Sequence, residues 1–223
     1  MWQKLYQDLS GHGFAVLAVA LDEPEAARPW VEAASPSYPC VIDRDHRVAE
    51  LYHFVNVPQA AWIDEKGRIV RPPENAGSSD AFRHMDRATG QMSAEQVEER
   101  VHMKSVYVEA IRDWVLKGQA SEHVFDKDAA RAHLRLPDAD MARAHAHFRL
   151  AQHLKLNGKD DEAAVHFGEA SRLHPRSWNI FRQSATKAAS GLAAGQDFWT
   201  RVDALGKDPY HLPIDMKGMS RKG

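Results

Sequence analysis

Short apolar runs alternate with amphipathic stretches over the first third of the chain. Trp2, Leu5 and Leu9 have helical spacing, and the continuous apolar run over 14–21 predicts a strand buried on both faces. The next predicted elements are a helix over 24–34, a strand over 38–43, a helix over 44–54 and a hairpin of strands over 58–64 and 68–71. This alternation indicates an α/β layer architecture.

The pattern becomes helical after residue 92, and no further strand is predicted. Residues 72–91 are rich in Pro, Gly, Ser, Asp and Asn and predict a surface connection. Ser93 and Gln96 form a capping-box pair at the start of a long helix. The predicted helices cover 93–117, 127–135, 140–157, 161–173, 177–189 and 196–205. The predicted organisation is an α/β domain over 1–75, a linker over 76–91, a helical domain over 92–207 and a tail over 208–223 that is expected to fray.

Residues 144–177 match the 34-residue tetratricopeptide pattern. The expected packing positions are Leu150, Ala151 and Leu154 in the first helix and Ala163, Phe167 and Ala170 in the second, with Gly158 at the turn and Pro175 at the end. His147 and Leu154 stand where the pattern has tryptophan and tyrosine. One such unit cannot bury its own faces. Two interpretations stay open: a groove for a peptide or partner protein, or a helical cap packed on the first domain.

Composition and charge exclude several classes of protein. The 223 residues carry 29 basic and 31 acidic side chains, so a nucleic-acid partner is not expected. No run of 18 apolar residues exists and the N-terminus has no signal-peptide pattern, so no membrane span is expected and the sequence as written indicates a cytoplasmic protein. No phosphate-loop, dinucleotide-binding, GxSxG or HExxH motif is present, and neither a cofactor nor a metal site is predicted.

Cys40 is the only cysteine, which excludes an internal disulfide and CxxC chemistry within this sequence. One interpretation is a small buried hydrophobe in the strand over 38–43. The other is a redox site, with Cys40 as a peroxidatic or resolving thiol. No basic residue stands within three positions before it, so the local sequence does not indicate an activated thiolate.

The stretch VNVPQAAWIDEKGRIV over 55–70 carries a family resemblance. It resembles the thioredoxin-like redoxins, and most closely the TlpA/ResA-type thiol–disulfide oxidoreductases, which overlap the AhpC/TSA class. The resemblance covers roughly residues 1–75. It implies a cis Val57–Pro58 bond and a substrate-facing loop at Val57 and Pro58. The partners that it implies are a protein thiol or disulfide, or a peroxide.

The resemblance also implies a nucleophile that this sequence does not contain. In the family a W-C-x-x-C-type motif begins the helix whose second half residues 1–9 resemble, so that motif and its preceding strand are expected just upstream of Met1. Three hypotheses follow: a truncated gene model, including one in which a selenocysteine codon is read as a stop; completion of the sheet by another chain or a swapped segment; or loss of the redox centre. The strand over 14–21 would then have an open edge through which the chain could oligomerise. An export signal lost with the same segment would make the protein exported or periplasmic.

The sequence therefore predicts an N-terminally incomplete thioredoxin-like α/β unit followed by an all-α tetratricopeptide-like domain. The expected function of the complete protein is redoxin-type thiol–disulfide exchange or peroxide reduction. The alternative is a redox-inactive scaffold that binds a protein partner through the Val57–Pro58 loop or the helical repeat.

Overall fold

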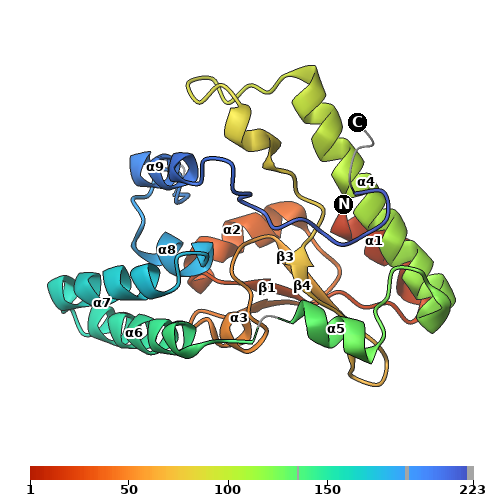
Figure 1. Cartoon of the computed structure of the whole chain (residues 1–223), viewed down its shortest axis with the longest axis horizontal. Helices are drawn as coiled ribbons and strands as arrows, with labels where there is room; N and C mark the ends of the chain where they lie inside the picture. The colour runs from red at the N-terminus through yellow and green to blue at the C-terminus, as the bar shows by residue number, and fades with distance from the viewer. Residues whose placement is uncertain (135, 189–190, 220–223) are drawn as a thin grey trace.

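The computed structural model describes residues 1–134, 136–188 and 191–219 (Figure 1). In the first third, helices and strands alternate as predicted. The elements are α1 (Trp2–Leu9), β1 (Ala18–Ala20), α2 (Pro24–Ala34), β2 (Cys40–Ile42), α3 (Arg47–Leu51), β3 (Gln59–Ile63) and β4 (Ile69–Asn75), with a 3₁₀ turn over Ser10–His12. Pro24 occupies the first turn of α2, where its fixed φ suits the helix and its missing N–H costs nothing.

The strands form two separate two-stranded sheets. β1 pairs with β2 in parallel, with Ala18 opposite Cys40, and β3 pairs with β4 in antiparallel fashion. The predicted strand over 14–21 is wrong in length and burial, because β1 has only three half-buried residues and the preceding Leu17 is 62% exposed. The physical reason is that β1 has a strand neighbour on one edge only among the described residues.

β4 extends beyond the predicted hairpin and continues through Pro72 and Pro73. Both prolines are tolerated because, within the described part of the chain, β4 pairs only with β3, which leaves its other edge without a ladder to interrupt. The predicted surface connection over 72–91 is therefore wrong in part. Its first residues belong to the strand, and Ala76 and Ala81 are buried.

Each helix predicted in the second part of the chain is present. The helices are α4 (Ala94–Lys117), α5 (Lys127–His133), α6 (Ala139–Leu156), α7 (Asp160–Leu173), α8 (Trp178–Ser184) and α9 (Gln196–Ala204), with 3₁₀ turns over Asp80–His84 and Gly118–Ala120. The capping box starts α4: Ser93 Oγ accepts from Gln96 N, and Gln96 Oε1 accepts from Ser93 N at 2.8 Å. The helix predicted over 177–189 is too long, because the backbone turns extended at Ala185 and α8 ends at Ser184. Residue 189, the last residue of the helix predicted over 127–135 and the last four tail residues lie outside the described residues.

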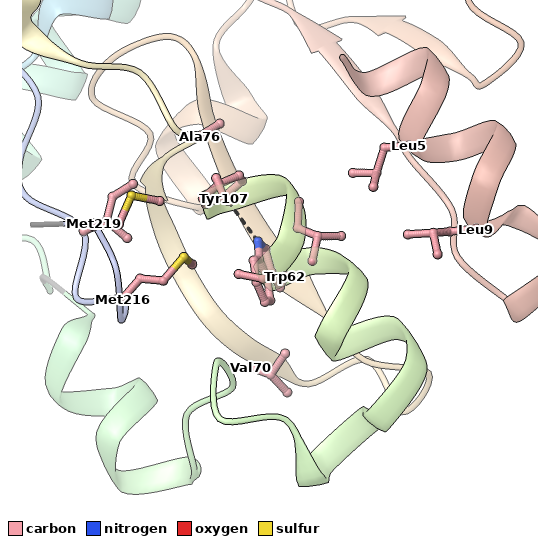
Figure 2. Packing of buried hydrophobic residues seen from close by; sticks show 11 residues of the cluster. Leu5, Leu9, Trp62, Val70, Ala76, Tyr107, Met216 and Met219 are labelled. Carbon is pink, nitrogen blue, oxygen red and sulfur yellow. Dashed lines mark hydrogen bonds between the residues drawn. The ribbon is translucent and has the colours of Figure 1, made fainter. Parts of the chain in front are cut away.

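One hydrophobic core joins the hairpin to helices far away in the sequence (Figure 2). Its buried members come from α1, the hairpin, α4 and the C-terminal segment, and include Leu5, Leu9, Trp62, Val70, Tyr107, Ile111, Met216 and Met219. Trp62 stacks on Trp114, and its Nε1 donates a hydrogen bond of 2.8 Å to the hydroxyl of Tyr107. Helix α4 therefore packs on the α/β part of the molecule. The predicted domain boundaries stay a prediction.

The C-terminal segment is part of this core, so the prediction of a frayed tail is wrong for its described residues. Ile214, Met216 and Met219 are each less than one-tenth exposed. The buried guanidinium of Arg71 in β4 donates to the backbone oxygens of Asp215 at 2.7 Å and His123 at 2.6 Å. A buried cation needs such partners, and here they tie the segment to the hairpin.

α6 and α7 form an antiparallel pair with a core of its own, at the opposite end of the molecule from α4 (Figure 1). The predicted packing residues Ala151, Leu154, Ala163, Phe167 and Ala170 are buried. The prediction for Leu150 is wrong, because its side chain is 42% exposed. The buried row of α6 runs through Ala144, Phe148 and Ala151, and Leu150 lies off this i, i+4, i+7 row. The tetratricopeptide character of the pair stays a prediction.

Candidate functional site

The loop before β3 contains both predicted substrate-facing residues, Val57 and Pro58. Their peptide bond is cis, and both side chains are exposed. The side chain of Gln59 organises the loop, because its Oε1 accepts from the backbone N–H groups of Val55 at 2.7 Å and Asn56 at 3.0 Å. The backbone on the N-terminal side of Val57 is therefore held by the first residue of the strand that follows.

Helix α8 holds the same loop from the helical part of the molecule. The backbone N–H groups of Trp178 and Asn179 donate to the oxygen of Val55 at 2.7 Å and 3.2 Å. The side-chain amide of Asn179 donates to the oxygen of Phe54 at 2.8 Å. These orphan donors at the start of α8 meet acceptors from the loop, so a helix more than a hundred residues away fixes the loop's position.

A buried polar cluster lies directly behind Val57. Asn56 Oδ1 accepts from Arg182 at 2.9 Å, from Val57 N at 2.9 Å and from the hydroxyl of Tyr210 at 3.4 Å. Arg182 also donates to the hydroxyl of Tyr210. Burial lowers the pKa of Arg182 and raises the pKa of Tyr210, so the phenol stays neutral at physiological pH. The cluster gives the loop a fixed backing.

A pocket of about 380 Å³ opens beside Pro58. The start of α1, the turn after β4, α4 and the C-terminal segment all contribute to it. Its lining consists of Met1, Trp2, Pro58, Ala76, Gly77, Ser78, Ser79, Phe82, Met92, Arg100, Lys104 and His211. The volume lies within the range of small-molecule sites, and most of the lining is apolar. We take this pocket, with the loop over 54–58, as the candidate site.

A carboxylate–imidazole pair stands at the wall of the pocket. Asp80 Oδ1 lies 3.0 Å from His211 Nδ1 and also accepts from the backbone N–H of His211, while Oδ2 accepts from Tyr210 N at 2.7 Å. Burial on its own would raise the pKa of Asp80, but the hydrogen bonds from His211 and Tyr210 hold that pKa below its usual value. An ionised Asp80 favours the His211 tautomer with its proton on Nδ1.

Cys40 lies apart from this pocket and is not among its lining residues. The interpretation of Cys40 as a small buried hydrophobe is wrong, because the thiol is exposed on β2, with its Sγ 3.8 Å from the oxygen of Tyr38. All three residues of β2 are exposed because this strand pairs only with β1 among the described residues. A redox role for Cys40 stays a prediction.

The histidines of the helical pair approach one another without forming a larger group. His147 Nδ1 and His166 Nδ1 are 2.8 Å apart, and the rings of His145 and His174 are 6.0 Å apart. Over the described ranges, no group of three or more His, Cys, Asp or Glu side chains is placed to hold a metal ion. Within the same ranges, no helix has the length and apolarity needed to cross a bilayer.

Comparison with known proteins concerns the first third of the chain. Residues 1–71 match the AhpC/TSA family. The thiol–disulfide oxidoreductase ResA of Halalkalibacterium halodurans is 33% identical over 70 residues, which are 31% of this chain and 40% of that protein. The chain thus spans about two-fifths of the length of this curated relative. No solved structure matches the chain. The comparisons therefore indicate a thioredoxin-like redoxin region over the first third of the chain.

Sequence reasoning pointed to Val57 and Pro58, whose substrate-facing role stays a prediction, and missed the polar residues that line the pocket. Arg100 and Lys104 carried a usable signal, since two cations stand one turn apart on a predicted helix without an acidic residue at the facing positions. His211 carried none, because it lies in a segment that the sequence predicted to fray. Its place in the pocket depends on the packing of the C-terminal segment into the core.

Proposed function

We propose that the redoxin region takes part in thiol–disulfide exchange at the pocket between Pro58 and the start of α1. The observation that carries the proposal is the family match over 1–71, combined with a pocket that Pro58, Met1 and Trp2 line together. In this proposal the exposed residue Val57 receives the extended chain of a protein thiol or disulfide. The polar cluster of Asn56, Arg182 and Tyr210 supports this role, because it fixes the loop before a partner binds. A loop that is already ordered loses less conformational entropy on binding.

The proposed nucleophile is a thiolate or selenolate on a segment that precedes Met1 and adds a strand beside β1. The open edge of β1 supports this proposal, since β1 pairs with β2 alone among the described residues. Leu17, next to β1, is 62% exposed, and an added strand would cover this apolar side chain. An unpaired strand edge of this kind accepts a further strand readily.

The proposed reaction follows ordinary thiol–disulfide exchange. The thiolate attacks one sulfur of the substrate disulfide, a mixed disulfide forms, and the old S–S bond breaks. The departing sulfur leaves as a thiolate and takes a proton from solvent. A second thiol, on the same upstream segment or from an external dithiol such as dithiothreitol, then cleaves the mixed disulfide, so that two electrons pass from the two thiols to the substrate. Peroxide reduction by the same thiolate is the related reaction of this class.

The first test is the intact mass of the native protein from its source organism, with its N-terminal peptide. We expect a mass above the 25.1 kDa of this sequence and a cysteine or selenocysteine in the additional peptide. The native protein should reduce insulin disulfides in the presence of dithiothreitol, and Cys40→Ser should leave that rate unchanged. A native mass of 25.1 kDa, or an additional peptide without either residue, would overturn the proposal.

A second candidate function is a redox-inactive scaffold that binds a protein partner. The observation in its favour is that the one thiol of this sequence, Cys40, does not line the pocket. Native protein that reduces neither insulin nor peroxide and still captures an extended peptide at Val57 would favour the scaffold. Binding should then weaken in a Val57→Asp variant, because the added carboxylate repels an acidic peptide and is costly to desolvate against an apolar one.

A further inference from the structure

The described lining of the pocket beside Pro58 contains two cationic side chains without a carboxylate as ion partner. Arg100 and Lys104 line it, and its lining includes no Asp or Glu. Arg100 donates to the sulfur of Met92 at 3.2 Å, and neither cation has an ion pair with a described carboxylate. Both side chains are exposed, so they are free to turn toward a bound anion.

The other basic residues of α4 are arranged differently. Arg112 pairs with Asp8 and with Glu109, and Lys117 pairs with Asp113. Arg100 and Lys104 instead face each other at i and i+4, and the positions three and four residues away from either hold no acidic residue. Like charges at this spacing repel each other, and an anion between them would remove the repulsion.

The opposite wall supplies further polar groups in a fixed position. His211 is nine-tenths buried, Asp80 accepts from its Nδ1, and its Nε2 has no partner among the described residues. Gly77 brings this wall directly against α4: with φ at +74°, an added Cβ would lie 2.9 Å from the Cβ of Tyr107. Ser78 and Ser79 follow at the same turn. One side of the pocket is therefore formed by backbone that packs closely against α4.

The remaining lining is apolar and includes Trp2, Pro58, Ala76, Phe82 and Met92. A pocket with an apolar body and a pair of cations on one helix fits a compact ligand with an uncharged body and an anionic end. Sulfur is a soft, weakly hydrated atom that suits such a body. The combination also stands next to Pro58, where the proposed exchange takes place.

We propose that this pocket binds a small carboxylate-bearing thiol or its disulfide, with a carboxylate between Arg100 and Lys104 and the sulfur toward Pro58. The inference rests on the proposed thiol–disulfide exchange and names a substrate class for it. It assigns Arg100 and Lys104 as binding residues. Lys127 and Arg131 on α5 have the same i, i+4 spacing and are exposed outside the pocket, so they provide a matched control.

Isothermal titration of the 223-residue chain with 3,3′-dithiodipropionic acid, the disulfide of a small carboxylate-bearing thiol, tests the inference, with its dimethyl ester as the uncharged comparison. We expect binding of the acid to be at least tenfold tighter than binding of the ester, and to weaken in 0.5 M NaCl because the charges are screened. The double variant Arg100→Gln/Lys104→Gln should lose at least tenfold in affinity for the acid, whereas Lys127→Gln/Arg131→Gln should bind as the wild type does. Nuclear magnetic resonance should show shifts of the Trp2 indole and the His211 imidazole on titration.

Three results would overturn the inference: no binding by the wild-type chain, equal binding of acid and ester, or equal loss in the pocket variant and the control variant. The titration needs no redox nucleophile, so it separates this inference from the proposed function. If the chain binds the acid selectively and the native protein exchanges no disulfides, the binding site is supported and the proposed disulfide exchange is rejected. If the native protein exchanges insulin disulfides but the chain does not bind the acid, only the proposed small-molecule substrate is rejected.

Discussion

The α6–α7 pair and the β1–β2 pair bury their apolar side chains to very different extents. The helical pair has a core of its own, with Ala144, Phe148, Ala151 and Phe167 each less than one-twentieth exposed. The strand pair has no such core: Val41 and Ile42 are 41% and 42% exposed, and β1 is half-buried. Both pairs are local in sequence, so sequence separation does not explain the difference.

The difference follows from where each element makes its backbone hydrogen bonds. A helix satisfies its N–H and C=O groups internally, so two helices need only side-chain contacts to form a core. A strand satisfies them through neighbours, and an isolated two-stranded sheet is marginal in water. The stability of the redoxin region therefore depends on packing against neighbouring elements. The hairpin β3–β4 packs against α4 and the C-terminal segment.

The largest expected effect tests this dependence at Trp62. We expect Trp62→Ala to lower the free energy of unfolding by about 3–5 kcal/mol, because it leaves a cavity beside Trp114 and removes the hydrogen bond to Tyr107. Urea unfolding followed by circular dichroism measures the change. Trp30, which is 62% exposed on α2, provides the matched control, and Trp30→Ala should change stability by no more than about 0.5 kcal/mol. Equal effects of the two substitutions would mean that the hairpin does not depend on α4.

A smaller loss of stability is expected at the contact between α8 and the loop before β3. Asn179→Ala removes the donor to the oxygen of Phe54 and should cost about 1–3 kcal/mol, since a buried acceptor loses its partner. Hydrogen exchange should become faster at the amides of Val55 and Asn56. Asn157→Ala is the control: it also removes an amide donor to a backbone oxygen, that of His153, but within the helical pair. Unchanged exchange in the loop after Asn179→Ala would contradict a positioning role for α8.

The smallest expected effect concerns the acid sensitivity of the helical pair. The pKa of His174 is lowered to about 4, mainly by burial; the positive charges of His145, His53 and Arg201 contribute to the lowering, and Asp138 opposes it. The folded state thus favours neutral His174, whose ordinary pKa is about 6.5. This contribution to stability is fully present above pH 6.5 and is lost as the pH falls toward 4.

Between pH 7 and pH 5 this loss should amount to about 1–2 kcal/mol. Urea unfolding at both values measures it as the difference between the wild type and His174→Gln, which cancels the other titrating groups. His12, which is exposed, provides the control variant His12→Gln, whose pH dependence should equal that of the wild type. A His174→Gln variant that loses as much stability as the wild type on acidification would contradict the assignment to His174.

Much of the redoxin region and of the helices could be predicted from sequence because the signals were local. Pro24 begins α2, Ser93 and Gln96 cap α4, and VNVPQAAWIDEKGRIV led to Val57 and Pro58. The comparisons agree with the family resemblance over residues 1–71. The exposure of Cys40 and Leu150 could not be predicted, since it depends on which neighbours a strand edge or a helix face acquires.

The sequence by itself determined the order of the elements, the helix boundaries set by caps and prolines, and the loop at Val57 and Pro58. Periodicity and capping involve residues within one or two turns, so a single chain segment contains that information. Only the tertiary structure decided that the C-terminal segment packs into the hairpin core, that α8 backs the loop, and that His211 joins Arg100 and Lys104 at one pocket. Those contacts link residues a hundred or more positions apart, and no local pattern specifies which distant surface will cover a given apolar face.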